Sequence, residues 1–441
     1  MSKNVVIIGG SLAALMCGVA LKHAGHSVTI LEKADNERQS HMAGVCLGRD
    51  AEEYLANHDR ITESFTHRSN RLQSFDDRHQ LKIFVNILRD ITSWDTLYYR
   101  LRSCFDAYQS SVYPSPPLAS DITGRALYSS RKAVIELEST NKGQKPGMTV
   151  TVLDRETQEV TDIRADLVIG ADGPDSFVRS KYLPKVKRKY VGYIAWRGTV
   201  PESDVSDETR AIFHRSVTLQ LMHLQHCLVY TIPGPNGSLA PGERLLNFLW
   251  YTNESSEALD EILIDGIDGH RHHNIVPAGR VRQDIWATRL DCARRVPLEP
   301  PFLEVISNIK SPFIQVITDF CSPQASFEDG RVLLVGDALS LYRSHTAFSG
   351  TQAAFDALRV ADYVEGKISL QRWEEKVLRF ARLHWSQSMW WGSYYQHRRP
   401  FAILTALHYW AYCAVDSIKS WWYGEEPLLR TSVSKIVPYE S

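Results

Sequence analysis

Three short blocks of the sequence place polar turn residues directly after an apolar run that is long enough for one buried strand. Each block combines glycine with an acidic side chain, either in the turn or at the end of the next strand. A helix that starts beyond such a turn directs unpaired N–H groups, and roughly half a positive charge, at the loop above it. The pattern predicts a site for a phosphate or an electron-rich ring. The blocks are Gly9-Gly10-Ser11 with Glu32, Asp172-Gly173, and Gly336-Asp337.

The block around Asp337 predicts a strand, a polar loop and a helix in succession. An apolar run ends in Gly336-Asp337, a loop follows over residues 340–350, and a helix covers 351–363. The helix is predicted because its apolar residues recur on one face. These are Ala354, Ala357, Leu358 and Ala361.

The first block predicts a strand-turn-helix-strand unit of the kind that binds dinucleotides. A strand ends at Gly9, a helix runs to about Gly25, and Glu32 follows the second strand roughly 20 residues beyond the glycines, where ribose hydroxyls need an acceptor. Ser11 and Ala14 replace the second and third glycines of the usual pattern. We expect weakened rather than abolished binding, and an ordinary buried βαβ start is the alternative.

Together the blocks resemble the single-component FAD-dependent aromatic hydroxylases, the group A flavoprotein monooxygenases. Residues 172–179 resemble their Asp-Gly motif and Gly336-Asp337 their Gly-Asp motif, while the loop 343–347 is similar to the 2,6-dihydroxypyridine 3-monooxygenase-like branch. The resemblance covers most of residues 4–365. It implies an α/β fold with a Rossmann-like FAD-binding domain, an antiparallel-sheet substrate domain and a C-terminal helical segment.

The resemblance also implies a set of cofactor-binding residues. Residues 92–101 resemble the helix that carries a flavin-contacting arginine in many relatives, and Trp94 stands at the place of that arginine. Arg100 and Arg102 are possible substitutes or simply solvated charges. A helix that begins near Ser349 would stabilise negative charge on the reduced flavin. The implied FAD-binding residues are Gly9, Gly10, Ser11, Leu12, Ala13, Glu32, Lys33, Asp172, Gly173, Gly336, Asp337, Thr346 and Ala347.

Substrate-binding and catalytic residues are less sharply defined by the sequence. Arg197, Trp250 and Tyr251 are candidates for the substrate pocket, and since Trp250 and Tyr251 alternate faces of one predicted strand, at most one of them lines it. A base that deprotonates a phenol or hydroxypyridine would raise the nucleophilicity of the ring. The candidates for that base are His345, His223 and Tyr193.

The chemistry implied is oxygen transfer from O2 by FAD, with NADPH or NADH as a transient co-substrate, because no second glycine-rich βαβ unit is present to hold it. We expect hydroxylation of an aromatic or electron-rich small molecule, with secondary metabolism as one setting for this reaction. An epoxidase or Baeyer-Villiger-type oxygenase on the same scaffold stays open. So does a catalytically idle flavin-binding protein, because Ser11, Ala14 and Trp94 depart from the usual motifs.

Composition excludes several other classes of protein. The 50 Lys and Arg residues balance 51 Asp and Glu residues, which gives no electrostatic footprint for nucleic acid. Seven scattered cysteines argue against a disulfide framework and a zinc site, and the histidines around Arg271 lack ligand spacing, so no metal is expected. The absence of a charged-then-apolar leader favours the cytoplasm.

With 441 residues, the chain exceeds what one hydrophobic core usually serves. We expect a discontinuous FAD-binding domain, a substrate-binding domain and a C-terminal helical region. The apolar run 401–415 is 15 residues long, short of the roughly 20 that span a bilayer, so a core-capping or dimer-forming helix pair is favoured over membrane contact. The expected ranges are 1–70, 92–182 and 322–370 for FAD, 71–91 and 183–321 for substrate, and 371–441 for the helical region.

Overall fold

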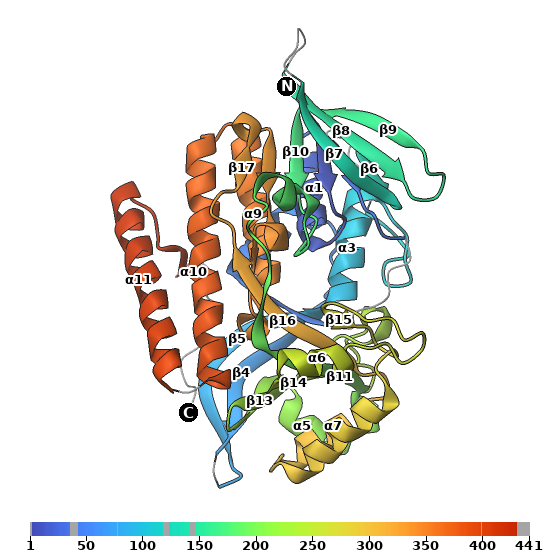
Figure 1. Ribbon diagram of the computed structural model, residues 1–441, viewed down its shortest axis with the longest axis vertical. Coiled ribbons are helices and arrows are strands. Elements are labelled where there is room, and N and C mark those ends of the chain that lie inside the picture. The colour runs from blue at the N-terminus through green and yellow to red at the C-terminus, as the bar shows by residue number, and fades with distance from the viewer. Residues whose placement is uncertain are drawn as a thin grey trace.

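The computed structural model describes residues 2–35, 43–76, 78–117, 123–140, 146–397 and 399–429. Within these ranges the strands form sheets of six, ten and three strands. Figure 1 shows the three-stranded sheet at one end of the molecule, the largest sheet toward the other end, and two long C-terminal helices side by side along one flank.

The six-stranded sheet has the order β17-β18-β10-β1-β2-β6, and all its neighbours pair in parallel except β17 with β18. Its central strands are almost continuously apolar, as expected for a sheet that is covered on both faces. Helices α1 (Leu12–His23), α3 (Trp94–Asp106) and α9 (Ser349–Val364) contribute buried side chains to the same core. The strands are β1 Asn4–Ile8, β2 Ser27–Leu31, β6 Ala126–Ser129, β10 Leu167–Gly170, β17 Ser326–Phe327 and β18 Val332–Leu334.

The ten-stranded sheet is antiparallel except where β4 pairs with β12. Because side chains alternate along a strand, each face of this sheet builds a different core. One face packs in a cluster with α5 (Asp207–Phe213), α6 (Ser256–Ile262), α7 (Gln283–Arg295) and α8 (Pro300–Ser307). The strands are β3 Gly44–Leu47, β4 His67–Phe75, β5 Leu81–Ser93, β11 Lys189–Pro201, β12 Ser216–Met222, β13 Gln225–Ile232, β14 Leu245–Asn253, β15 Ile275–Val276, β16 Phe313–Cys321 and β19 Ser340–Leu341.

Two expected boundaries differ from the structure. The boundary expected at residue 71 falls inside β4, because this strand pairs with β12 from Arg71 through Ser74 and with β5 from His67. The helix expected to begin at Thr92 begins at Trp94, since the two preceding residues complete β5. Ser93 caps this helix by accepting a hydrogen bond from the backbone N–H of Thr96 at 3.1 Å.

The three-stranded sheet consists of β7 (Lys132–Thr140), β8 (Gly147–Asp154) and β9 (Val160–Ala165), with antiparallel pairing throughout. Two short helices, α2 (Arg49–His58) and α4 (Phe177–Tyr182), complete the part before β11. The α/β fold that the resemblance implied, with its parallel nucleotide-binding sheet, its antiparallel sheet and its C-terminal helices, is therefore confirmed.

The chain ends in two long helices, α10 (Leu370–Gln396) and α11 (Arg399–Tyr423), which lie side by side in Figure 1. The helix α11 is longer than the apolar run 401–415, since it extends over 25 residues, and 22% of its apolar 18-residue window is buried. By length and composition alone, α11 could cross a membrane. The helix continues past Asp416 because this residue and Ser420 face inward and are buried.

Candidate active site

The three motif blocks meet at one edge of the six-stranded sheet. Strands β18, β10, β1 and β2 are neighbours and run parallel, so their carboxyl ends lie at the same edge. Gly9 follows β1, Glu32 follows β2, Asp172 follows β10 and Asp337 follows β18. Ligands of open α/β sheets bind beyond the carboxyl ends of such strands.

The first turn is held against its neighbours by two close contacts. Gly9 has φ +95°, and a Cβ atom there would lie 2.4 Å from the carbonyl oxygen of Ala171. The N–H of Gly10 donates to a carboxylate oxygen of Glu32 at 2.7 Å. Ser11 is the N-cap residue of α1, and its side chain makes no capping hydrogen bond. The start of α1, with half-buried Leu12 and Ala13, therefore directs its unpaired backbone N–H groups at this edge. Lys33, which follows Glu32, is exposed.

Asp172 has two roles available to it. One carboxylate oxygen accepts hydrogen bonds from the N–H groups of Phe177 at 2.7 Å and Val178 at 3.2 Å, and so caps α4. The other oxygen is buried and has no hydrogen-bond partner among the described residues. Burial raises the pKa of this carboxyl. Gly173 has φ +76° and open space around it. A capping aspartate thus keeps one oxygen for a further group.

The turn at Gly336 is clamped by α9. Its N–H donates to Asp356 at 2.8 Å, and the side-chain amide of Gln352 donates to its carbonyl oxygen at 3.0 Å. Gly336 has φ +58°, and a Cβ atom there would lie 2.7 Å from the Cβ of Ala13. Half-buried Asp337 follows, and burial raises its pKa to about 6 against the opposing effect of the Arg188 charge.

Sequence reasoning missed the two clamping residues. Gln352 and Asp356 are four residues apart on the buried face of α9, among alanines and other apolar residues. Two polar side chains at this spacing on an apolar face are a signal that could have revealed them, because a buried polar group needs a partner.

Arg179 joins two of the blocks directly. Its guanidinium donates to the carbonyl oxygen of Ala338 at 3.0 Å and to that of Pro174, and it lies 4.0 Å from the centre of the Phe320 ring. The side chain is buried. The segment after β10 and the segment after β18 are therefore tied to each other by one fixed cation.

The loop after β19 is fastened to the ten-stranded sheet. The Tyr193 hydroxyl and His345 Nε2 form a hydrogen bond of 2.8 Å, and so do the hydroxyls of Tyr251 and Ser344. Arg343 Nε donates to Asp319 at 2.5 Å. The next residues, half-buried Thr346 and exposed Ala347 with φ +54°, lead into the first turn of α9.

Aromatic rings and two histidines cover this face of the sheet. The ring of His226 stacks on Tyr251 with centroids 4.7 Å apart, lies 4.3 Å from that of Tyr395, and lies 5.3 Å from that of His345. Burial lowers the pKa of His226 to about 3 and that of His345 well below its usual value, where His226 and Arg343 add repulsion. Both imidazoles are therefore neutral at pH 7, and Nδ1 of His345 has no partner in the described part of the chain.

Two polar side chains on the same face have unused hydrogen-bonding capacity. Arg197 lies on β11 four residues after Tyr193, and it donates to the Gln315 side chain at 2.8 Å, while its Nε finds no partner within the described ranges. Asn247 on β14 is completely buried, and its amide makes no well-formed hydrogen bond to a described residue. A group that accepts hydrogen bonds could satisfy both.

Two candidates from the sequence do not reach this face. Trp250 lies on the opposite face, because neighbouring residues of a strand alternate, and its Nε1 donates to Gln225 at 3.1 Å. His223 is exposed in the turn between β12 and β13. The buried histidine of that hairpin is His226, three residues further on in β13, which sequence reasoning missed.

The helix α3 approaches the first turn through aromatic and basic side chains. Trp94 stacks on Tyr98 with centroids 4.8 Å apart. The guanidinium of Arg102 lies 3.6 Å from the ring centre of Tyr128, whose hydroxyl donates to the Gly10 carbonyl at 3.1 Å. Arg100 instead forms a buried ion pair with Asp59 at 2.6 Å. Neither arginine is a solvated charge.

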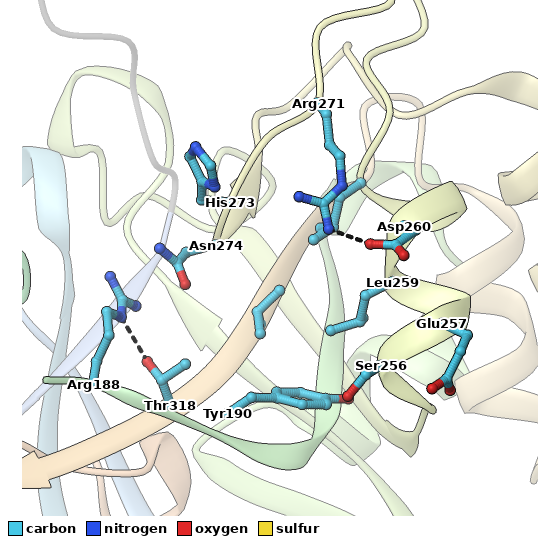
Figure 2. A pocket seen from close by; sticks show the side chains of 12 residues that line it. Arg188, Tyr190, Ser256, Glu257, Leu259, Asp260, Arg271, His273, Asn274 and Thr318 are labelled. Carbon is cyan, nitrogen blue, oxygen red and sulfur yellow. Dashed lines mark hydrogen bonds and ion pairs between the residues drawn. The ribbon is translucent and has the colours of Figure 1, made fainter.

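A cavity of about 380 Å³ lies elsewhere, between β11, β16 and α6 (Figure 2). Its lining includes Val316, which belongs to the core on the Trp250 face of the sheet. Arg188 donates to Thr318 at 3.0 Å and Arg271 pairs with Asp260, so both cations in the lining are already engaged. None of its lining residues belongs to the three motif blocks. The described residues contain no group of three or more His, Cys, Asp or Glu side chains suited to a metal ion.

Comparisons with known proteins identify the family to which most of the chain is similar. Residues 2–226 match a family model described as FAD binding domain, and residues 190–319 match one described as FAD binding domain-like. The chain is similar to 2,6-dihydroxypyridine 3-monooxygenase of Paenarthrobacter nicotinovorans, with 26% identity over 410 residues that cover 90% of this chain and 93% of that protein.

Solved structures show a similar overall shape. The structure of 2,6-dihydroxypyridine-3-hydroxylase from Arthrobacter nicotinovorans superposes with a TM-score of 0.75 and 25% identity, over 90% of this chain and 93% of the other. A substrate complex of salicylate hydroxylase superposes with a TM-score of 0.65 and 17% identity, over 99% of each chain. The second similarity concerns the fold alone.

The substitution Gly336→Ala tests the close approach between the Gly-Asp turn and α1. We expect it to lower the free energy of unfolding by roughly 2–4 kcal/mol, because it adds an overlap with Ala13 to the cost of left-handed backbone. Gly242→Ala is the matched control, since Gly242 has φ +91° and open space. Urea unfolding of both variants measures the difference, and equal losses would contradict the role of the close approach.

Asp356→Asn tests the buried carboxyl that clamps Gly336. The pKa of Asp356 is raised to about 8 by burial, so ionisation favours the unfolded chain, and stability is lost as pH rises from about 4 to about 8. The variant lacks this loss. We expect its stability relative to the parent to increase by roughly 1–3 kcal/mol between pH 5 and pH 7 in urea unfolding. Glu159 is exposed, so Glu159→Gln serves as the control. A difference in unfolding free energy between Asp356→Asn and the parent that does not change with pH would contradict the assignment.

Proposed function

The chain belongs to the FAD binding domain family and is an FAD-dependent monooxygenase, and we propose that it uses NAD(P)H and O2 to hydroxylate an aromatic or similarly electron-rich small molecule. The resemblance to FAD-dependent aromatic hydroxylases that the three blocks predicted is confirmed by this membership. In the proposed reaction, one oxygen atom of O2 enters the substrate and the other leaves as water, with two electrons supplied by NAD(P)H.

The observation that carries the proposal is the meeting of the three blocks at one sheet edge, where donors and acceptors are left over. We assign the pyrophosphate to the N-terminus of α1 around Ser11, and the ribose to Glu32. The unpaired oxygen of Asp172 and the carboxylate of Asp337 are the proposed acceptors for the remaining hydroxyl groups of FAD. Gly10, Gly173 and the backbone of Thr346 and Ala347 complete the proposed set. The proposed FAD-binding domain keeps the ranges 92–182 and 322–370, and its first range ends before β4 begins at His67 rather than at residue 70.

Bound FAD supplies the electron transfer and the oxygen activation, which no side chain of this site can perform. The protein positions the cofactor and the substrate and shields them from water. The first turn of α9 follows the loop at Ala347 and directs backbone donors at negative charge that develops nearby. The hydrogen bonds from Tyr193 and Tyr251 to the loop close the gap between loop and sheet, which excludes water from the space between them.

The substrate is proposed to lie on the Tyr251 face of the ten-stranded sheet. Tyr251 and His226 offer flat, uncharged rings to an aromatic molecule, and Arg197 offers a cation with a free donor. A phenolate or hydroxypyridine oxygen would satisfy this donor, and the positive charge would favour the deprotonated, more nucleophilic ring. The similar 2,6-dihydroxypyridine 3-monooxygenase supports a substrate of this class.

The purified full-length chain tests the proposal. We expect a yellow protein whose flavin absorbance is bleached by NADPH or NADH, faster when 2,6-dihydroxypyridine or a related phenol is present. With ¹⁸O2, the product should be heavier by one labelled oxygen atom bound to a ring carbon. Yellow protein that neither nucleotide bleaches would identify an idle flavin-binding protein. A ring-expanded ester would identify a Baeyer-Villiger-type oxygenase, and colourless protein that cannot be reconstituted with FAD would contradict the whole assignment.

Arg197→Gln tests the assignment of the substrate face. Loss of a charged hydrogen bond to the substrate should lower kcat/KM by roughly 10- to 100-fold, while FAD content and flavin reduction without substrate stay unchanged. Arg271 lines the cavity of Figure 2 and pairs with Asp260, so Arg271→Gln is the matched control and should leave kcat/KM unchanged. Full kcat/KM in Arg197→Gln, or an equal loss of kcat/KM in both variants, would contradict the assignment.

A further inference from the structure

A helix on a protein surface usually buries its apolar face and exposes its polar face, and α11 does the opposite. Its inward face, which packs on α10, is buried and largely polar. Its outward face is apolar and exposed. The buried residues are Ala402, Thr405, Tyr409, Asp416 and Ser420. The exposed large apolar residues are Phe401, Ile403, Leu404, Leu407, Trp410, Val415, Ile418, Trp421, Trp422 and Tyr423.

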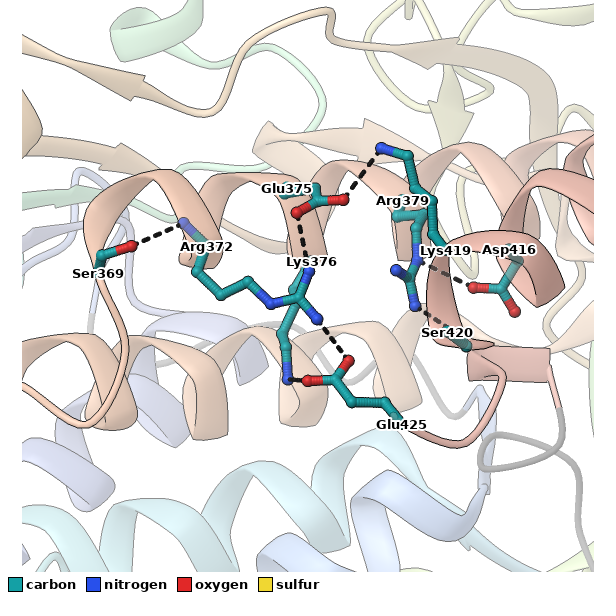
Figure 3. Close-up of polar contacts among 9 residues, drawn as sticks. All are labelled: Ser369, Arg372, Glu375, Lys376, Arg379, Asp416, Lys419, Ser420 and Glu425. Atoms are coloured by element: carbon teal, nitrogen blue, oxygen red, sulfur yellow. Dashed lines mark hydrogen bonds and ion pairs between the residues drawn. The ribbon is translucent and has the colours of Figure 1, made fainter. Parts of the chain in front are cut away.

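Polar contacts keep α11 alongside α10 (Figure 3). Arg379 forms an ion pair with Asp416 at 2.9 Å and donates to the Ser420 hydroxyl at 2.9 Å. Both charged side chains of this pair are buried. Lys419 pairs with Glu375 at 3.0 Å. If α11 left α10 and entered the lipid chains of a bilayer, Asp416 would lie there without Arg379, which is unfavourable for an unpaired charge.

The segment after α11 strengthens this attachment. Glu425 forms ion pairs with Arg372 at 2.6 Å and with Lys376 at 2.8 Å, both on α10 (Figure 3). α11 is therefore held along the surface of the enzyme while its apolar face points outward. A helix in this arrangement cannot cross a bilayer alone, although its length and composition would permit it.

The outward face is wider than one helical partner would cover. Phe401 and Trp410 are both exposed and are nine residues apart, which separates them by about 180° around the helix axis. A coiled-coil partner covers only a narrow stripe. Between Arg399 and Lys419 the helix has one charged residue, Asp416, and this residue faces inward. A lipid layer covers a broad, uncharged arc of this kind, whereas a second helix leaves its edges in water.

Aromatic residues mark the carboxyl end of the same face. Trp421 is 78% exposed and Trp422 is 75% exposed, and these adjacent side chains lie beside exposed Ile418. Tryptophan prefers the boundary between lipid headgroups and acyl chains, because its ring is apolar and its N–H needs a polar partner. In water, such exposure of large rings is unfavourable.

We propose that the outward face of α11 lies in the interfacial layer of a lipid bilayer, parallel to the membrane plane, and holds the enzyme on the membrane surface. The proposal reverses the expectation that membrane contact is disfavoured, which rested on a 15-residue apolar run. It is independent of the assignment of the substrate. A second copy of the chain on the same face is the competing occupant, and the experiment distinguishes the two.

The full-length holoprotein is mixed with preformed vesicles of phosphatidylcholine and sedimented, and a parallel sample without lipid is examined by analytical ultracentrifugation. We expect the protein to sediment with the vesicles. Vesicles that contain brominated acyl chains should quench part of the tryptophan fluorescence, and Trp421→Phe with Trp422→Phe should remove part of this quenching.

Leu404→Gln with Leu407→Gln should weaken partition into the vesicles by at least roughly tenfold, with flavin absorbance unchanged. Ile267→Gln is the matched control, since Ile267 is an apolar residue that is 70% exposed on another part of the surface. Protein that stays in the supernatant overturns the proposal. If analytical ultracentrifugation then shows a dimer that the leucine variant dissociates, the occupant of the face is a second copy of the chain. Equal loss of partition in the variant and the control overturns it as well.

Discussion

The arrangement of the site depends on two glycines that lie too close to a neighbouring segment for a side chain. At Gly9 the first turn touches the backbone that follows β10, and at Gly336 the turn after β18 touches the start of α1. Parallel pairing of the strands brings these turns to one edge of the sheet, and the two contacts then fix their separation. A Cβ at either glycine would push the turns apart, so the chemistry of the edge depends on glycine at both places.

Around this edge, buried polar side chains join parts that are distant in sequence. Arg179 ties the Asp-Gly segment to the segment after Asp337, and α9 clamps Gly336 from the other side. The loop that follows is in turn bonded to Tyr193 and Tyr251 of the ten-stranded sheet. A shift of the loop would therefore disturb contacts on both sides. These contacts keep the proposed cofactor position and the proposed substrate face aligned.

Local patterns predicted the parts of the fold that depend on neighbours in sequence. The strands that precede Gly9, Asp172 and Gly336 and the helix α9 were predictable because apolar runs and turn residues determine them within about a dozen positions. The spacing of Gln352 and Asp356 signals two buried polar groups, but a single sequence does not reveal that their partner is Gly336. The placement of His226 likewise depends on contacts between distant segments. The apolar run 401–415 ends at Asp416 in the sequence, and the buried partner Arg379 explains why α11 continues beyond it.

The central claim, that three separated segments surround one flavin, is tested most directly by hydrogen–deuterium exchange of the apoprotein before and after reconstitution with FAD. The account predicts slower exchange in residues 9–15, 172–179 and 336–350 together, at the same FAD concentration, with no change in α7 or α11. Protection of only one of these segments, or protection centred on the cavity beside Arg188 and Arg271, would contradict it.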